Sequence, residues 1–98
     1  MTNWEFKREP TTPGEILKEE FLKPMGLTQK KLASHIGVDL KVINRIVNGR
    51  AGITAKVAIK LGSAFGTSPE LWLNAQIATD LWNTNKLETN LPGIIKAA

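Results

Sequence analysis

Apolar side chains along this chain recur three and four positions apart, which is the spacing of one face of an α-helix. The pattern occupies five stretches, and no stretch shows the sustained apolar–polar alternation of a half-buried strand. We therefore predict an all-α fold with no substantial sheet. Its five helices, counted with their caps, would occupy residues 12–26, 28–37, 39–48, 54–66 and 68–83.

Two of these helices follow each other with almost no connection. Thr28 and Asp39 are suitable N-caps, because their side-chain oxygens can accept from the free N–H groups of a first helical turn. Gly37 ends the first of the two, since a residue without Cβ enters the left-handed conformation at little cost. Asn48 and Gly49 end the second as a turn signal. Segment 27–49 therefore predicts a helix-turn-helix, a motif that places its second helix in the DNA major groove.

The second helix of the motif has one apolar and one polar face. Its predicted buried stripe is Ile43, Ile46 and Val47, after Leu32, Ala33 and Ile36 in the preceding helix. Arg pairs well with guanine, Asn with adenine, Lys with guanine or phosphate, and an apolar side chain with a thymine methyl. We therefore predict a base-reading face that consists of Leu40, Lys41, Asn44 and Arg45. The alternative is that these are ordinary solvated residues of a surface helix.

A second set of residues is predicted to contact the DNA backbone, which is bound by basic and hydroxyl side chains and by helix N-termini. It consists of Thr28, Gln29, Lys30, Lys31 and Arg50.

The remaining helices extend the motif into a bundle. Thr12 and Glu15 form a capping box with Pro13 at the first helical position, and Pro24 and Gly26 close that helix. Thr54 caps the fourth helix and Ser68 the fifth. The predicted core positions of the first and fourth helices are Ile16, Leu17, Phe21, Leu22, Val57, Ala58, Leu61, Ala64 and Phe65.

The last helix has apolar residues on two roughly opposite sides when it is wound at about 100° per residue. One side carries Leu71, Ala75, Ala78 and Trp82, and the other carries Leu73, Ile77 and Leu81. A terminal helix in a small domain needs only one apolar face, so we predict that Leu73, Ile77 and Leu81 form a homodimer interface. The alternative is that the C-terminal segment folds back over this side, with Leu91, Ile94 and Ile95 as the cover.

Charge is concentrated on the predicted motif. The chain of 98 residues has a formal net charge of +4, yet residues 23–60 alone carry +7 and the rest of the chain −3. A concentrated basic region is the electrostatic footprint of a polyanion-binding protein. A membrane surface would attract the same charge, but no strongly basic amphipathic helix has an aromatic apolar face. Nucleic acid is the favoured partner.

Length and composition limit the other classes. Ninety-eight residues make one small domain, which we divide into an N-terminal arm (1–11), a helical domain (12–83) and a C-terminal tail (84–98). The absence of cysteine excludes disulfides and thiolate metal sites and fits the cytoplasm. No stretch suggests a membrane span, a signal peptide, a phosphate-binding glycine loop or a metal-ligand cluster. The only histidine, His35, is expected on the surface at a helix end. We predict no enzyme activity, no cofactor and no metal.

Four segments resemble the HigA antitoxins, XRE-type regulators also known as virulence-associated protein I. They are Pro13–Leu22 (PGEILKEEFL), Leu27–Gln29 (LTQ), Asn48–Thr54 (NGRAGIT) and Gly66–Asn74 (GTSPELWLN). The helix-turn-helix part is shared across the superfamily, whereas the first and last segments are more specific. The resemblance implies a lambda-repressor-like (XRE/Cro) bundle with short flanking arms.

The resemblance also implies a function. HigA-type proteins are bacterial antitoxins that neutralise a small RelE-like, mRNA-cleaving toxin of the HigB type, and as dimers they repress their own operon by binding its operator. The DNA-binding role would fall on Gln29, Leu40, Lys41, Asn44 and Arg45. Asp39 stands where the family often has Ser, and Leu40 where a polar residue often follows, so the operator sequence is not implied.

Two other functions compatible with the sequence are a stand-alone XRE-family repressor without a toxin and a protein-interaction module that has lost DNA binding. Trp4 and Phe6 stand in a charged segment before the predicted bundle. They would either anchor the toxin or the other subunit, or fold onto the last helix or the tail.

Overall fold

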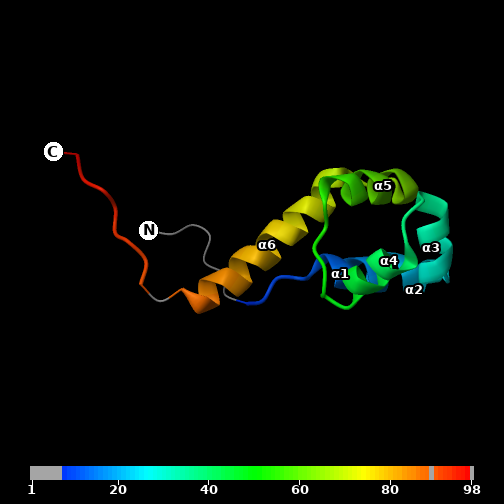
Figure 1. Ribbon diagram of the computed structural model, residues 1–98, viewed down its shortest axis with the longest axis horizontal. Coiled ribbons are helices and arrows are strands. Elements are labelled where there is room, and N and C mark those ends of the chain that lie inside the picture. The colour runs from blue at the N-terminus through cyan, green and yellow to red at the C-terminus, as the bar shows by residue number, and fades with distance from the viewer. Residues whose placement is uncertain (1–7, 89, 98) are drawn as a thin grey trace.

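The computed structural model describes residues 8–88 and 90–97, and within them it contains five helices and no strand. The first helix is continuous and consists of α1 (Pro13–Ile16), a π-helical stretch (Leu17–Leu22) and α2 (Lys23–Met25). It is followed by α3 (Gln29–Ile36), α4 (Leu40–Val47), α5 (Ala55–Phe65) and α6 (Pro69–Leu87). The helices from α1 to α5 form a bundle from which α6 projects (Figure 1). The predicted all-α, five-helix fold is confirmed.

The helices begin where side-chain caps predict. Thr12 Oγ1 accepts from Glu15 N at 3.1 Å while Glu15 Oε1 accepts from Thr12 N at 3.1 Å, which completes the capping box. Thr28, Thr54 and Ser68 likewise accept from the backbone N–H three residues ahead. These bonds satisfy N–H groups that have no partner inside a helix.

Three helices end at a glycine in the left-handed region, namely Gly26 (φ 60°), Gly37 (φ 72°) and Gly66 (φ 70°). The first helix reaches Gly26 although Pro24 lies in its last turn. A proline ring clashes with the carbonyl four residues back in a regular α-helix. That carbonyl belongs to Glu20, which lies inside the wider π-helical stretch and therefore has a different position.

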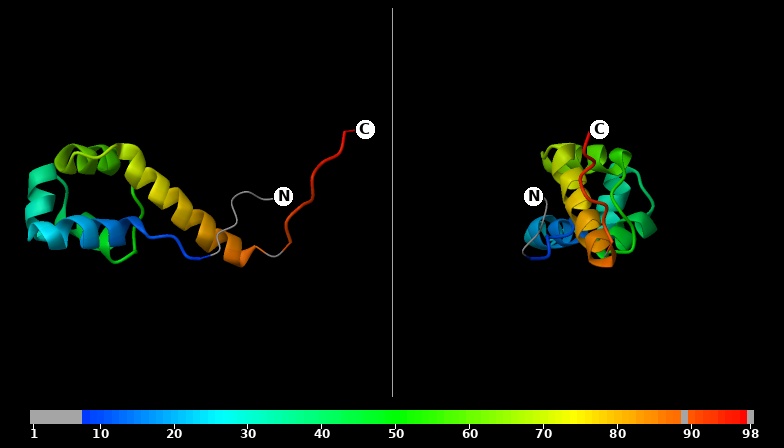
Figure 2. Two further views of the ribbon diagram at one scale, coloured as in Figure 1. Left: turned by 180° about the vertical axis from the view of Figure 1, so that it is seen from behind. Right: turned by 90° about the vertical axis from the view of Figure 1, so that its left-hand side faces the viewer.

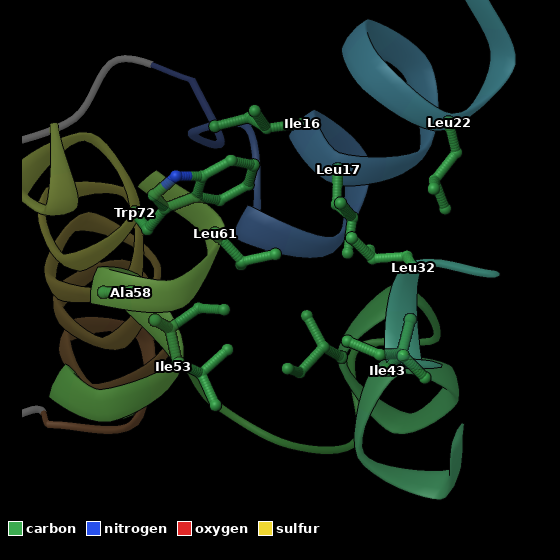
Figure 3. Packing of buried hydrophobic residues seen from close by; sticks show 12 residues of the cluster. Ile16, Leu17, Leu22, Leu32, Ile43, Ile53, Ala58, Leu61 and Trp72 are labelled. Atoms are coloured by element: carbon green, nitrogen blue, oxygen red, sulfur yellow. The ribbon is translucent and has the colours of Figure 1, made fainter. Parts of the chain in front are cut away.

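The core is built around Trp72, whose side chain is fully buried (Figure 3). Its ring centroid lies 5.5 Å from that of Phe21 and 6.3 Å from that of Phe65, and its Nε1 donates to Thr67 Oγ1 at 2.9 Å. A buried indole needs such a partner for its N–H. The other buried apolar residues are Ile16, Leu17, Leu22, Leu32, Ala33, Ile43, Ile46, Ile53, Val57, Ala58 and Leu61.

The inward face of α6 lies between the two apolar sides that periodicity defined. It is centred on Trp72, and Leu73 and Ala75 on either flank are half-buried against the core. Leu71, from the other predicted side, is 39% exposed. The position of this face follows from the aromatic cluster, because the large indole contributes more buried area than any flanking aliphatic residue.

The last helix is longer than expected. The predicted end of this helix at residue 83 is wrong, because α6 continues to Leu87, and Glu88 N still donates to Thr84 O at 3.2 Å. Lys86 Nζ lies 5.8 Å from the centroid of the Trp82 ring, a cation–π contact one turn apart that favours continuation. The far half of α6 extends beyond the bundle (Figures 1 and 2).

The described residues of the tail lead away from the bundle (Figure 2). Leu91, Ile94 and Ile95 are 57%, 87% and 93% exposed, so they do not cover α6 within the chain. Trp4 and Phe6 lie outside the described residues. Within the described ranges, no helix is both long enough and apolar enough to cross a membrane.

Candidate nucleic-acid interface

The α3–α4 pair forms the helix-turn-helix, and one backbone conformation and two hydrogen bonds fix its turn. The left-handed Gly37 reverses the chain, Val38 N donates to Ala33 O at 3.0 Å, and Lys60 Nζ of α5 donates to Gly37 O at 3.3 Å. On the inner side, Leu32 and Ile43 are both almost inaccessible and point into the same core (Figure 3). The motif is therefore a rigid platform.

The first helix supports α4 from behind. Gly14 lies so close to α4 that a Cβ there would overlap the carbonyl oxygen of Ile46. Leu17, one turn later, is fully buried. Backbone-to-backbone contact of this kind allows almost no change in the separation of the two helices. The Pro–Gly–Glu segment thus fixes the position of α4.

The outer face of α4 carries the predicted base-reading side chains. Leu40, Lys41, Asn44 and Arg45 are all exposed. Together with three residues from the start of α3 and the turn, they line one shallow hollow; those residues are Gln29, Lys30 and Asp39. The convex face of α4 can enter a DNA groove and reach base edges, while the neighbouring hollow leaves room for the phosphate backbone.

A chain of amide hydrogen bonds crosses this face. Asn44 Nδ2 donates to Gln29 Oε1 at 3.1 Å, and Asn48 Nδ2 donates to Asn44 Oδ1 at 3.2 Å. These two bonds use one hydrogen of Asn44 Nδ2 and one lone pair of Asn44 Oδ1, so each atom can still make a second hydrogen bond. Asn44 is therefore held in one orientation with a donor and an acceptor available for a base. The sequence indicated Asn48 only as a helix end, so its hydrogen bond to Asn44 was not predicted.

Asp39 is an N-cap whose carboxylate Oδ1 accepts from Lys41 N at 2.8 Å. A negative charge at this end complements the positive pole of the α4 helix dipole. The acidic residue in a basic region thus has a local structural role.

The predicted phosphate-contacting residues do not form a single patch. Gln29 and Lys30 border the base-reading hollow, whereas Lys31 borders an apolar groove beside Met25 and His35. Arg50 lies beyond the far end of α4, where it borders a third hollow with Thr12, Gln76 and Asp80.

The lysines of this surface keep their charge uncompensated within the described part of the chain. The ion pair found there joins Lys23 to Glu19 at 3.0 Å, and none involves Lys30, Lys31 or Lys41. Thr28, whose hydroxyl caps α3 by accepting from Lys31 N at 3.1 Å, is exposed at the same helix start. Uncompensated lysines beside a helix N-terminus favour an anionic partner.

The predicted dimer residues differ in accessibility. Ile77 and Leu81 are 56% and 40% exposed, whereas Leu73 is half-buried and packs against the core of its own chain. His35 is exposed. Over residues 8–88 and 90–97, no group of three His, Cys, Asp or Glu side chains has an arrangement that could hold a metal ion.

Comparisons with known proteins match the sequence and the fold. A helix-turn-helix family model matches residues 18–72. Antitoxin HigA-1 of Vibrio cholerae is 53% identical over 78 residues, which cover 80% of this chain and 73% of the relative.

Two solved structures are similar over most of their length. Antitoxin GraA superposes with a TM-score of 0.79 at 41% identity, over 82% of this chain and 86% of that one. The antitoxin HigA of Pseudomonas aeruginosa, solved with the higBA promoter, superposes with a TM-score of 0.77 at 34% identity, over 88% and 99%.

Proposed function

Since the chain belongs to the HigA-type antitoxins of the helix-turn-helix family, we propose that it binds the operator of its own operon as a homodimer and neutralises a small RelE-like toxin. Its helical domain, residues 12–83, would carry both DNA binding and dimerisation. The observation that carries the proposal is the exposed α4 face, in which Asn44 is held by Gln29 beside Leu40, Lys41 and Arg45.

Operator reading would use the side chains of α4 in the major groove. Arg45 has the geometry to pair with guanine O6 and N7, Asn44 with adenine, Lys41 with guanine or phosphate, and the 44%-exposed Leu40 with a thymine methyl. Thr28, Gln29, Lys30, Lys31 and Arg50 would hold the phosphates on both sides of that groove. The HigA structure solved with the higBA promoter supports this use of the fold.

Dimerisation would use α6. Ile77 and Leu81 expose apolar surface on its outer side, and the exposed part of the Leu73 side chain would extend that surface. A two-fold dimer presents two α4 helices, which matches an operator with two half-sites. Burial of these side chains would be worth about 25 cal/mol for each Å² of apolar surface removed from water.

The proposed chemistry is binding alone. The described residues offer a polar recognition face and apolar contact surfaces, and His35 stands at an exposed helix end without a carboxylate or nucleophile bonded to it. We propose that the chain is not an enzyme and that it inhibits the toxin by occupying it.

Co-expression tests the toxin-neutralising part of this proposal. A small toxin-like reading frame beside the gene would be expressed alone and together with this chain. Growth arrest by the neighbour alone, rescue by co-expression and co-purification of the two proteins are the expected results. Growth arrest that persists in cells containing both proteins would contradict the antitoxin role, and would leave a stand-alone repressor as the better description.

A further inference from the structure

A polar side chain lies on the inner side of α6, next to the outer apolar face. Gln76 is half-buried, and its Oε1 accepts a hydrogen bond from the backbone N–H of Ile53 at 2.9 Å. Ile53 itself is buried in the core. A single glutamine therefore ties the last helix to the end of the loop that joins α4 and α5.

The orientation of the Gln76 amide is fixed by a second bond. Its Nε2 donates to Asp80 Oδ1 at 2.9 Å. Because an ionised carboxylate only accepts, this bond leaves Oε1 as the atom that faces the loop. Gly52 allows the close approach, since a Cβ there would lie 3.2 Å from both Cδ and Oε1 of Gln76. The amide thus lies directly against the loop backbone.

The loop is held at both ends by hydrogen bonds. At its start, Arg50 N donates to Arg45 O at 2.7 Å and Gly49 N donates to Ile46 O at 3.1 Å. At its end it is held by Gln76 through Ile53. Arg50 and Gln76 border the same hollow. The direction in which the Arg50 side chain leaves the loop therefore depends on both anchors.

We infer that Gln76 is a positioning residue for operator binding, which holds the α4–α5 loop so that Arg50 meets a phosphate. This inference rests on the proposed function. The next residue, Ile77, is on the outer side of α6 and belongs to the proposed dimer interface. One turn of α6 would then join the dimer contact to the DNA contact, so that formation of the dimer steadies the loop.

Loss of the glutamine has a defined physical cost. Without Oε1, the Ile53 N–H has no acceptor in a half-buried place, where an unmade hydrogen bond is costly. The loop would gain conformational freedom, and Arg50 would have to be ordered again whenever DNA binds. The loss should therefore appear in operator binding and in its salt dependence.

The test uses Gln76→Met, which keeps the length of the side chain and its helix propensity but removes both polar atoms. Asn74→Met, at an exposed position of the same helix, is the matched control. Operator affinity would be measured against salt for these variants, for Arg50→Ala and for the double variant. Each lost phosphate contact lowers the magnitude of the negative slope of log K against log salt by about 0.9.

We expect Gln76→Met to weaken operator binding at least threefold. It should lower the magnitude of the salt slope by about the same amount as Arg50→Ala. The double variant should bind no more weakly than Arg50→Ala alone. Amide hydrogen exchange at Ile53 should be faster in Gln76→Met, and Asn74→Met should behave as wild type. Asp80→Ala removes the carboxylate that orients the Gln76 amide and should also weaken operator binding. Because Asp80 is exposed, this variant replaces Gln76→Met in the test if Gln76→Met does not fold.

Two results would contradict the inference. Additive losses for Gln76→Met and Arg50→Ala, or an unchanged slope in Gln76→Met, would overturn the positioning role while wild-type operator binding stands. Failure of the wild-type chain to prefer its operator over unrelated DNA would overturn the proposed function itself, and the inference with it.

Discussion

Asn44 Nδ2 donates a hydrogen bond to Gln29 Oε1 at 3.1 Å, which joins the middle of α4 to the first residue of α3. The two residues are fifteen positions apart and meet only because the Gly37 turn folds α4 across α3. Asn44 is thereby oriented before any DNA arrives. A side chain that is already ordered loses less entropy when it binds a base.

The first prediction concerns this pair. Gln29→Ala and Asn44→Ala should each weaken operator binding, and the double variant should lose less than the sum of the two. We expect a coupling energy of about 0.5–3 kcal/mol, as for residues that share a hydrogen bond. Fluorescence anisotropy with labelled operator DNA measures all four affinities. Strict additivity would show that Gln29 does not orient Asn44.

The second prediction concerns the exposed lysines at the start of α3. Lys30→Ala and Lys31→Ala should weaken binding to specific and unrelated DNA alike, because phosphate contacts carry no sequence information. Each substitution should lower the magnitude of the salt slope by about 0.9. Lys86→Ala, at the far end of α6, is the control for loss of one positive charge. A slope unchanged by Lys30→Ala would exclude that residue from the interface.

The third prediction concerns the dimer. Ile77→Glu together with Leu81→Glu should give a folded monomer, because both side chains are more than one-third exposed within the chain. Leu73 is left intact, since its contacts with the core would confuse assembly with folding. Sedimentation gives the oligomeric state and circular dichroism the helix content. Leu87→Glu, on the same helix and 81% exposed, is the control. A dimer that survives the double substitution would place the interface elsewhere.

The fourth prediction concerns Gly14. Gly14→Ala should lower the free energy of unfolding by about 1–3 kcal/mol, because the new Cβ would push α1 away from the Ile46 carbonyl. Urea denaturation measures the effect. Gly93→Ala is the matched control, since a Cβ there would meet no atom within 4 Å. If the two variants have equal stability, the close approach of α1 to α4 does not constrain the fold.

The helix boundaries were largely predictable because they depend on local chemistry. Thr28, Asp39 and Gly37 act through hydrogen bonds and backbone angles within four residues of themselves, so the sequence alone shows where α3 ends and α4 begins. The exposure of the α4 face followed from the same periodicity. Local rules of this kind do not need the tertiary structure.

The remaining features depend on contacts that periodicity does not contain. Trp72 decides which side of α6 faces inward, because it completes an aromatic cluster with Phe21 and Phe65 from two other helices. The role of Gln76 depends on its distance from Ile53, twenty-three positions away. The continuation of α6 to Leu87 likewise overrides the weak helix propensity of residues 83–85.

The most direct test of the central proposal is the affinity of the purified chain for DNA from upstream of its own gene, measured in competition with unrelated DNA of equal length. We predict at least about a thousandfold preference at physiological salt. Arg45→Ala should reduce specific binding by about 1–3 kcal/mol and relax the requirement at one base position in each half-site. Equal affinity for both DNAs, or an Arg45→Ala variant with wild-type specificity, would contradict the proposal that α4 reads an operator.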